Sequence, residues 1–137
     1  MPTIEAAMSI AASGLRAQSS RMRVIAENVA NADSTAATPG GDPYRRQVPV
    51  FEAELNRAMG VEQVRMARTT PDRSDFSIRY EPGHPAADDQ GYVKYSNVNT
   101  LIELMDLRAA QRSYEANLSV IENGRAMLTR TLDLLRR

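Results

Sequence analysis

Apolar residues recur along the first thirty residues at alternating steps of four and three, the spacing of a helix that buries one stripe. Thr3 is a suitable cap residue, so we predict a helix from about residue 4 to about residue 31. The sequence ENVANADS at 27–34 ends this pattern, because asparagine bonds free carbonyl groups or adopts a left-handed backbone. The stripe consists of Ile4, Met8, Ala11, Leu15, Gln18, Met22, Ile25, Val29 and Ala32.

A second stripe of the same spacing fills the last third of the chain. Thr100 and Glu103 form the pattern T-x-x-E, which predicts a capping box at the start of a helix. We therefore predict a terminal helix of about 36 residues, much longer than the average helix of a globular protein. The stripe consists of Leu104, Leu107, Gln111, Tyr114, Leu118, Ile121, Arg125, Leu128, Leu132 and Leu135.

The segment between the two stripes has a different composition. Residues 33–96 hold six of the seven prolines and five of the seven glycines, which excludes a long helix there. Alternation predicts a half-buried strand at 76–80 and an edge strand at 48–50 around Pro49. A helical turn at 51–59 is a further candidate. The segments 38–43 and 81–91 are predicted loops.

These patterns predict a mainly α fold with a small β-rich insert. The two long terminal helices would pair as an antiparallel coiled coil, with a strand and loop lobe between them, which divides the chain into 1–32, 33–96 and 97–137. A two-helix pair buries only one stripe of each partner and is marginal alone. We therefore expect both helices to contribute to an assembly interface made of Ile4, Met8, Leu15, Met22, Ile25, Asn28, Val29, Asn31, Leu104, Leu107, Tyr114, Asn117, Leu118, Ile121, Leu128 and Leu132.

Polar residues at three stripe positions leave two interpretations open. A polar residue on a helix seam can fix register or partner choice at a cost in stability. The same residue can instead face solvent. The three residues are Gln18, Gln111 and Arg125.

Composition and charge narrow the classes of function. Seventeen basic and seventeen acidic side chains cancel, which disfavours a partner held by net charge, such as nucleic acid or an anionic membrane. The absence of cysteine excludes disulfides and thiolate chemistry. Glu5 interrupts the apolar start and no basic segment precedes it, so we expect a soluble protein without a cleaved signal peptide.

Few residues are candidates for catalysis or metal binding. His84, Asp88 and Asp89 do not have the spacing of a strong metal or acid–base site, and the neighbouring prolines and glycines indicate turns. We expect no catalytic, metal or cofactor site and no small-molecule substrate, with a hydrolase using His84 as a minor alternative. The middle segment is locally basic, and we interpret its arginines as a solvated face or the rim of an interface. They include Arg45, Arg46, Arg65, Arg68 and Arg73.

Three long segments carry a resemblance to a known family. They are VIAENVANADST at 24–35, YEPGHPAADDQGYVKYSNVN at 80–99 and RSYEANLSVIENGRAM at 112–127. In this order and spacing they resemble the bacterial flagellar basal-body rod proteins of the rod and hook axial family, and among these the proximal rod proteins.

The resemblance implies a structural subunit, not an enzyme. It implies export through the flagellar type III apparatus without a cleaved signal, and polymerisation in the periplasm into a shaft that transmits torque. The implied partners are other rod subunits, the basal adaptor protein and further copies in a helical assembly. In this context Asn28, Asn31 and Asn117 are predicted to present polar contacts to neighbouring subunits. A soluble helical adaptor or secretion chaperone that binds a partner helix is the alternative.

Overall fold

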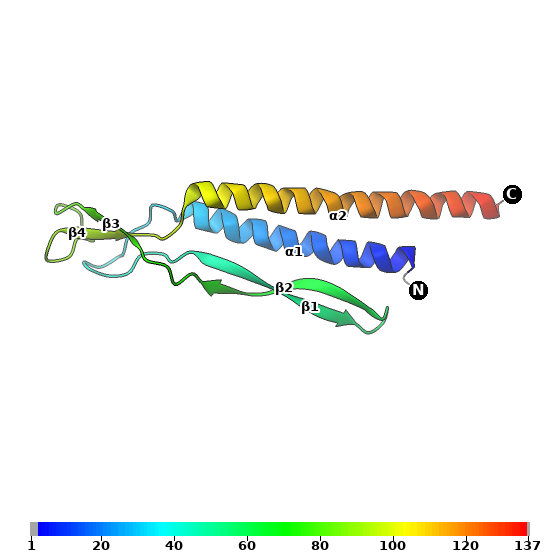
Figure 1. Ribbon diagram of the computed structural model, residues 1–137, viewed down its shortest axis with the longest axis horizontal. Helices are drawn as coiled ribbons and strands as arrows, with labels where there is room; N and C mark the ends of the chain where they lie inside the picture. Colours follow the sequence, from blue (N-terminus) through cyan, green and yellow to red (C-terminus); the bar gives the residue numbers. More distant parts are fainter. Residues whose placement is uncertain (1–2, 137) are drawn as a thin grey trace. The chain divides into compact units, whose positions relative to one another are not determined.

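The computed structural model describes residues 3–136, which form two long helices with short strands between them (Figure 1). This arrangement confirms the mainly α fold with a small β-rich insert. The elements are α1 at Ile4–Ala30, β1 at Gln47–Asn56, β2 at Val61–Pro71, β3 at Ser77–Tyr80, β4 at Tyr92–Tyr95 and α2 at Thr100–Leu135.

The ends of α1 follow from its sequence. The Thr3 hydroxyl accepts a hydrogen bond from the amide of Ala6 at 3.1 Å, which is the predicted cap. At the other end, the Asn31 side chain donates to the carbonyl of Glu27 at 2.8 Å. The backbone amide of Asn31 bonds the same carbonyl at 3.1 Å, but the next amide, of Ala32, donates to the carbonyl of Val29, three residues back. The α-helical bonding pattern therefore stops, and α1 ends at Ala30.

The start of α2 differs from the predicted capping box. The side-chain oxygen of Asn99, not of Thr100, accepts from the amide of Leu101 at 3.1 Å. The carboxylate of Glu103 turns away from the helix end and bonds Arg46. The capping-box prediction was therefore wrong, because a partner remote in sequence competes for the glutamate. Neither described helix is both long and apolar enough to span a bilayer.

Strands β1 and β2 pair in a two-stranded sheet. Gly60 adopts a φ of 67° at the connecting turn, and its amide donates to the carbonyl of Asn56 at 2.8 Å. The candidate helical turn at 51–59 was wrong, since β1 continues to Asn56. In FEAELN the charged residues alternate with the other side chains, a period of two that suits a strand.

Strands β3 and β4 form a separate antiparallel pair, with Tyr80 opposite Tyr92 and Arg79 opposite Val93. Val93 is fully buried, whereas Ile78 and Tyr80 are 62% and 65% exposed. The strand at 76–80 was predicted to bury its apolar face, and this prediction was wrong. On the opposite face, next to the buried Val93, the guanidinium of Arg79 lies 4.4 Å from the ring centroid of Tyr95, although Arg79 itself is exposed.

The chain divides into two compact units, and each contains part of both helices. Unit 1 comprises 1–22, 50–68 and 108–137, and unit 2 comprises 23–49 and 69–107. Among the described residues, the buried apolar side chains of unit 1 are all alanine, which agrees with the low aromatic content. They are Ala6, Ala11, Ala17 and Ala110, whereas unit 2 buries Val24, Ile25, Ala86 and Val93.

Candidate assembly surfaces

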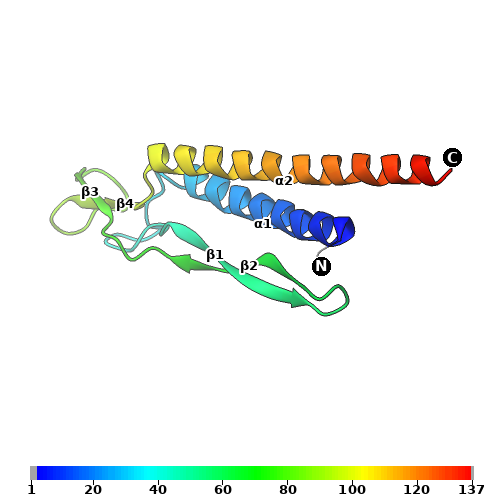
Figure 2. The same cartoon turned by 45° about the vertical axis from the view of Figure 1, so that its right-hand side comes forward.

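In unit 1, α1 and α2 lie side by side in both views of the molecule (Figures 1 and 2). Two glycines mark their closest approach. A Cβ atom at Gly14 would lie 2.6 Å from the Asn117 side chain, and one at Gly124 would lie 2.7 Å from that of Met8. Because the α1 number falls as the α2 number rises, the helices run in opposite directions through this unit.

The buried face of α2 differs from the predicted stripe at every second position. Leu107, Tyr114, Ile121 and Leu128 are at least half-buried, as predicted. The alternate positions are taken by the residues one place earlier than predicted, which are small or polar: Glu103, Ala110, Asn117 and Gly124. Leucine fits a simple apolar stripe, but Ala110 and Gly124 are small enough to let the two helices approach closely.

The displaced positions remain on the surface of the described chain. Leu104, Leu118 and Leu132 are 45%, 38% and 60% exposed. Gln111 and Arg125 continue the same row and are also exposed, which favours the solvent-facing interpretation for both in the single chain. The row is therefore available for contact with another protein.

Helix α1 is covered on a second side by the β1–β2 sheet within unit 1. The side-chain amide of Gln63 donates to the hydroxyl of Ser9 at 2.5 Å, and the amide of Val64 donates to the hydroxyl of Ser13 at 3.2 Å. The Ser13 hydroxyl also donates to the carbonyl of Ile10 at 2.6 Å, so this buried group is fully bonded. Of the predicted interface on α1, Ile25 and Asn28 are buried, and Ile4, Met8, Leu15, Met22, Val29 and Asn31 are half-buried.

Asn28 is the centre of a polar junction in unit 2. Its side-chain NH₂ donates to the carbonyl of Gln47 at 2.8 Å, and its oxygen accepts from the Gln47 amide at 3.0 Å. The oxygen also accepts from the Tyr44 hydroxyl at 2.6 Å. Asn28 thus pairs with a backbone residue as a strand partner would, and it is only 1% exposed in the single chain. Burial and the nearby acids Glu27 and Glu103 raise the pKa of Tyr44, which keeps its hydroxyl a donor.

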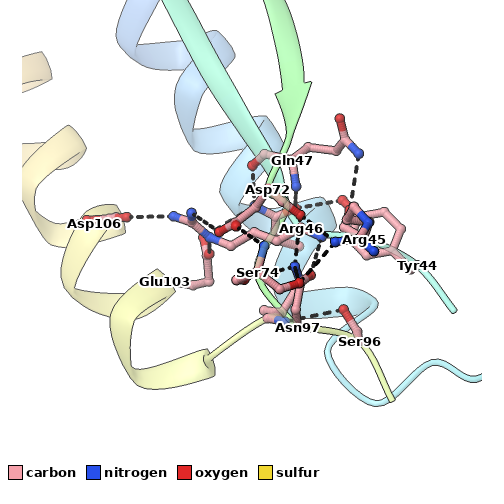
Figure 3. A network of polar contacts seen from close by, with 12 residues as sticks. Tyr44, Arg45, Arg46, Gln47, Asp72, Ser74, Ser96, Asn97, Glu103 and Asp106 are labelled. Atoms are coloured by element: carbon pink, nitrogen blue, oxygen red, sulfur yellow. Dashed lines mark hydrogen bonds and ion pairs between the residues drawn. The ribbon is translucent and has the colours of Figure 1, made fainter. Parts of the chain in front are cut away.

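Arg46 bonds three carboxylates, and two of them, Glu103 and Asp106, belong to α2 (Figure 3). It bonds Glu103, which is 1% exposed, and its other nitrogens lie 3.2 Å from Asp72 and 3.4 Å from Asp106. Burial alone would lower the pKa of Arg46, but the bond and charge of Glu103, with those of Asp72, raise it. A buried carboxylate needs such a partner, so Arg46 fixes the first turn of α2.

Asn97 completes the junction from the segment before α2 (Figure 3). Its oxygen accepts from the Arg46 amide at 2.7 Å, and its NH₂ donates to the carbonyls of Asp72 at 3.0 Å and Ser74 at 3.2 Å. Hydrogen bonds from the backbone and then the side chain of Ser74, with Arg46, lower the pKa of Asp72. The junction therefore ties four separate chain segments together.

The sequence interpretation missed this junction. It treated Arg46 as part of a solvated basic face or the rim of an interface, whereas Arg46 is 20% exposed and pairs with the buried Glu103 of its own chain. One signal was present: Glu103 falls among apolar residues at the start of a long stripe, and a charge there requires an opposite charge. Nothing in the sequence says which of seventeen basic residues supplies it.

His84 lies in the turn that its neighbours predict. Its Nδ1 accepts a hydrogen bond from the amide of Ala86 at 3.0 Å, and its ring centroid lies 6.4 Å from that of Tyr95. The ring thus stabilises the loop at 81–91 in the described structure.

Two segments of the chain match known families. Residues 8–37 match the family described as flagella basal body rod protein, and residues 89–134 match the C-terminal region of the flagellar basal body rod FlgEFG proteins. The first match covers most of α1, and the second covers β4 and most of α2. Both families define a class of structural proteins of the flagellar basal body.

Curated relatives make the assignment more specific. The chain is 52% identical to the flagellar basal-body rod protein FlgC of Agrobacterium fabrum over 99% of its length and 98% of the relative's. It is 40% identical to FlgC of Salmonella typhimurium, covering 91% and 92%, and 37% identical to FlgC of Borreliella burgdorferi, covering 93% and 95%. The chain therefore belongs to the FlgC family of flagellar basal-body rod proteins, and it is a structural subunit of the basal-body rod.

Proposed function

We propose that this subunit polymerises through its terminal helices into the proximal part of the rod, the shaft that transmits torque. The observation that supports this proposal is the exposed row on α2, in which three leucines, Leu104, Leu118 and Leu132, alternate with Gln111 and Arg125. A helix that presents apolar rows on more than one side requires more than one neighbour. Contact between two different surfaces of successive subunits produces an open helical stack.

The predicted interface residues have different parts in this proposal. The exposed leucines of α2 contact neighbouring subunits directly. Ile25 and Asn28 are buried within the chain, so they act by holding α1 in the shape that assembles. Met8 and Tyr114 are half-buried and belong to the faces by which α1 and α2 pack together. This packing holds both helices in the arrangement that assembles.

The proposal includes specific partners. These are further copies of the chain, other rod subunits and the adaptor protein at the rod base. We also propose that the chain reaches the periplasm through the flagellar type III export apparatus without a cleaved signal.

The test is complementation of a strain that lacks the gene. The wild-type chain should restore motility and co-purify with basal bodies, whereas Leu118→Glu combined with Leu132→Glu should be exported yet absent from them. Ser119→Glu with Thr129→Glu is the matched control, because it places the same charges on exposed polar positions of α2. A wild-type chain found only in the cytosol would contradict rod assembly and favour the adaptor or chaperone alternative.

A further inference from the structure

We infer that an apolar groove in unit 1 receives the C-terminal turns of α2 from a second copy of the chain. The inference rests on the proposed assembly through terminal helices, and it specifies which two surfaces meet. The groove has a volume of about 390 Å³ and lies between the first turns of α1 and the later part of α2. Its apolar walls include Ile4, Ala7, Met8, Val120, Gly124 and Met127.

The occupant is suggested by the length of α2. Met8 and Ile4 contact α2 at Gly124, and α2 then continues to Leu135, a further distance of about 16 Å at 1.5 Å per residue. Figures 1 and 2 show these turns extending past the start of α1. We call residues 128–136, which follow the last groove residue Met127, the overhang.

The overhang carries the apolar side chains that such a groove needs. Leu132, Leu134 and Leu135 are 60%, 71% and 78% exposed. Leu135 continues the spacing of Tyr114, Ile121 and Leu128, which belong to the buried face of α2, but Leu135 itself is exposed. The first turns of a neighbour's α1 would supply the missing helix surface, and Ala7 would allow close approach.

Charge favours the same pairing. The segments that line the groove, 3–8 and 120–127, contain the two acids Glu5 and Glu122 and the single basic residue Arg125. The overhang contains two arginines, Arg130 and Arg136, against the single acid Asp133. The two surfaces are therefore complementary in charge as well as in apolar character.

The subunit's role in a rod decides the symmetry of the contact. If two copies exchanged overhangs mutually, the contact would be two-fold and would close as a dimer. A rod needs a contact that leaves one groove and one overhang free. The neighbour is therefore aligned in the same direction and displaced along α2 by about ten residues, or about 15 Å.

Disulfide crosslinking tests this inference directly, since the chain has no cysteine of its own. Chains carrying Ala7→Cys are mixed with chains carrying Leu132→Cys and oxidised mildly. The matched control replaces Ala7→Cys by Ser119→Cys, an exposed position on α2 outside the groove. We expect the groove pair to give at least about tenfold more crosslinked dimer than the control, because a formed contact raises the effective concentration. Equal yields would overturn the inference.

A photo-crosslinking residue at position 132 repeats the test in basal bodies from complemented cells. Capture of residues 3–8 or 120–127 of a second copy supports the inference, whereas capture of a different rod protein or another region overturns it. If the replacement at 132 prevents folding, as judged by circular dichroism, the probe is placed at Arg136. Basal bodies that contain the chain without the groove crosslink would reject this contact only, whereas absence of the wild-type chain from basal bodies would reject the proposed function.

Discussion

The two units of this chain are held together by different means. Unit 1 joins helices through small residues, with Gly14 against Asn117, Gly124 against Met8, and alanines as the buried apolar side chains among its described residues. Unit 2 surrounds a polar junction in which Asn28, Arg46 and Glu103 bond several separated segments. The contact between α1 and α2 in unit 1 is thus specified by shape, whereas the junction of unit 2 is specified by directed hydrogen bonds and charge.

The difference is consistent with the proposed role. Small-residue contacts bury little apolar area and leave the larger leucines of α2 on the outside, where they can contact other subunits. A polar junction tolerates only one set of partners, because a buried donor or acceptor without its partner costs free energy. Unit 2 would therefore fix the position where α1 ends and α2 begins, while unit 1 presents the surfaces for assembly.

Breaking the charged pair of unit 2 should have the largest effect. Arg46→Met leaves the carboxylate of Glu103 buried without its main partner, and we expect a loss of about 3 kcal/mol in the free energy of unfolding. Arg65→Met in unit 1 is the matched control. Arg65 is half-exposed and lies 3.6 Å from each of Glu52 and Glu54, so its loss should cost less than about 1 kcal/mol. Urea unfolding measures both, and equal losses would contradict the distinction between the units.

The two asparagines of ENVANADS provide the next comparison. Asn28→Ala removes the partners of the Gln47 backbone and of Tyr44, so we expect a loss of about 2 kcal/mol. Asn31→Ala removes one exposed bond to Glu27 and should change stability by less than about 0.5 kcal/mol. Thermal unfolding of the two variants side by side measures the difference. A larger loss for Asn31→Ala would mean that the stretch acts mainly as a helix stop.

Adding a methyl group at Gly14, where α1 contacts Asn117 of α2, should have a smaller effect. Glycine to alanine inside a helix normally stabilises by about 1 kcal/mol, but a methyl group at Gly14 would overlap the Asn117 side chain. We expect Gly14→Ala to cost about 1 kcal/mol net, because overpacking outweighs the gain in helix propensity. Adding Asn117→Ala removes the overlap and should recover part of the loss. Stabilisation by Gly14→Ala alone, measured by urea unfolding, would show that the close approach is not required.

Lowering the pH should produce the smallest effect, through Asp72 in unit 2. The pKa of Asp72 is lowered in the folded chain, so its contribution to stability is present above the unfolded pKa and is lost as the pH falls through the folded pKa. The Tm difference between the wild-type chain and Asp72→Asn should therefore shrink as the pH is lowered from neutral to below the ordinary aspartate value. A difference that stays constant with pH would show that the charge of Asp72 does not contribute.

The helices were predictable because each carries its own signals. The spacing of apolar residues located α1 and α2, and Thr3 and Asn31 marked the ends of α1 in the positions observed. The assembly interface remains a prediction, although Leu104, Leu118 and Leu132 lie on the surface where it requires them. The strands were less predictable. Period-two alternation indicated that 76–80 is extended but not which of its faces would be covered.

The amino-acid sequence by itself determined the helical ends of this protein, its glycine- and proline-rich middle and the motifs that it shares with rod proteins, since these depend on residues near one another in the chain. Only the tertiary structure decided which residues of α2 face α1, that Asn99 and not Thr100 caps α2, and that Arg46 partners Glu103. The physical reason is that a close helix contact and a buried charge are satisfied by groups far apart in sequence, and a local pattern does not specify which distant group will reach them.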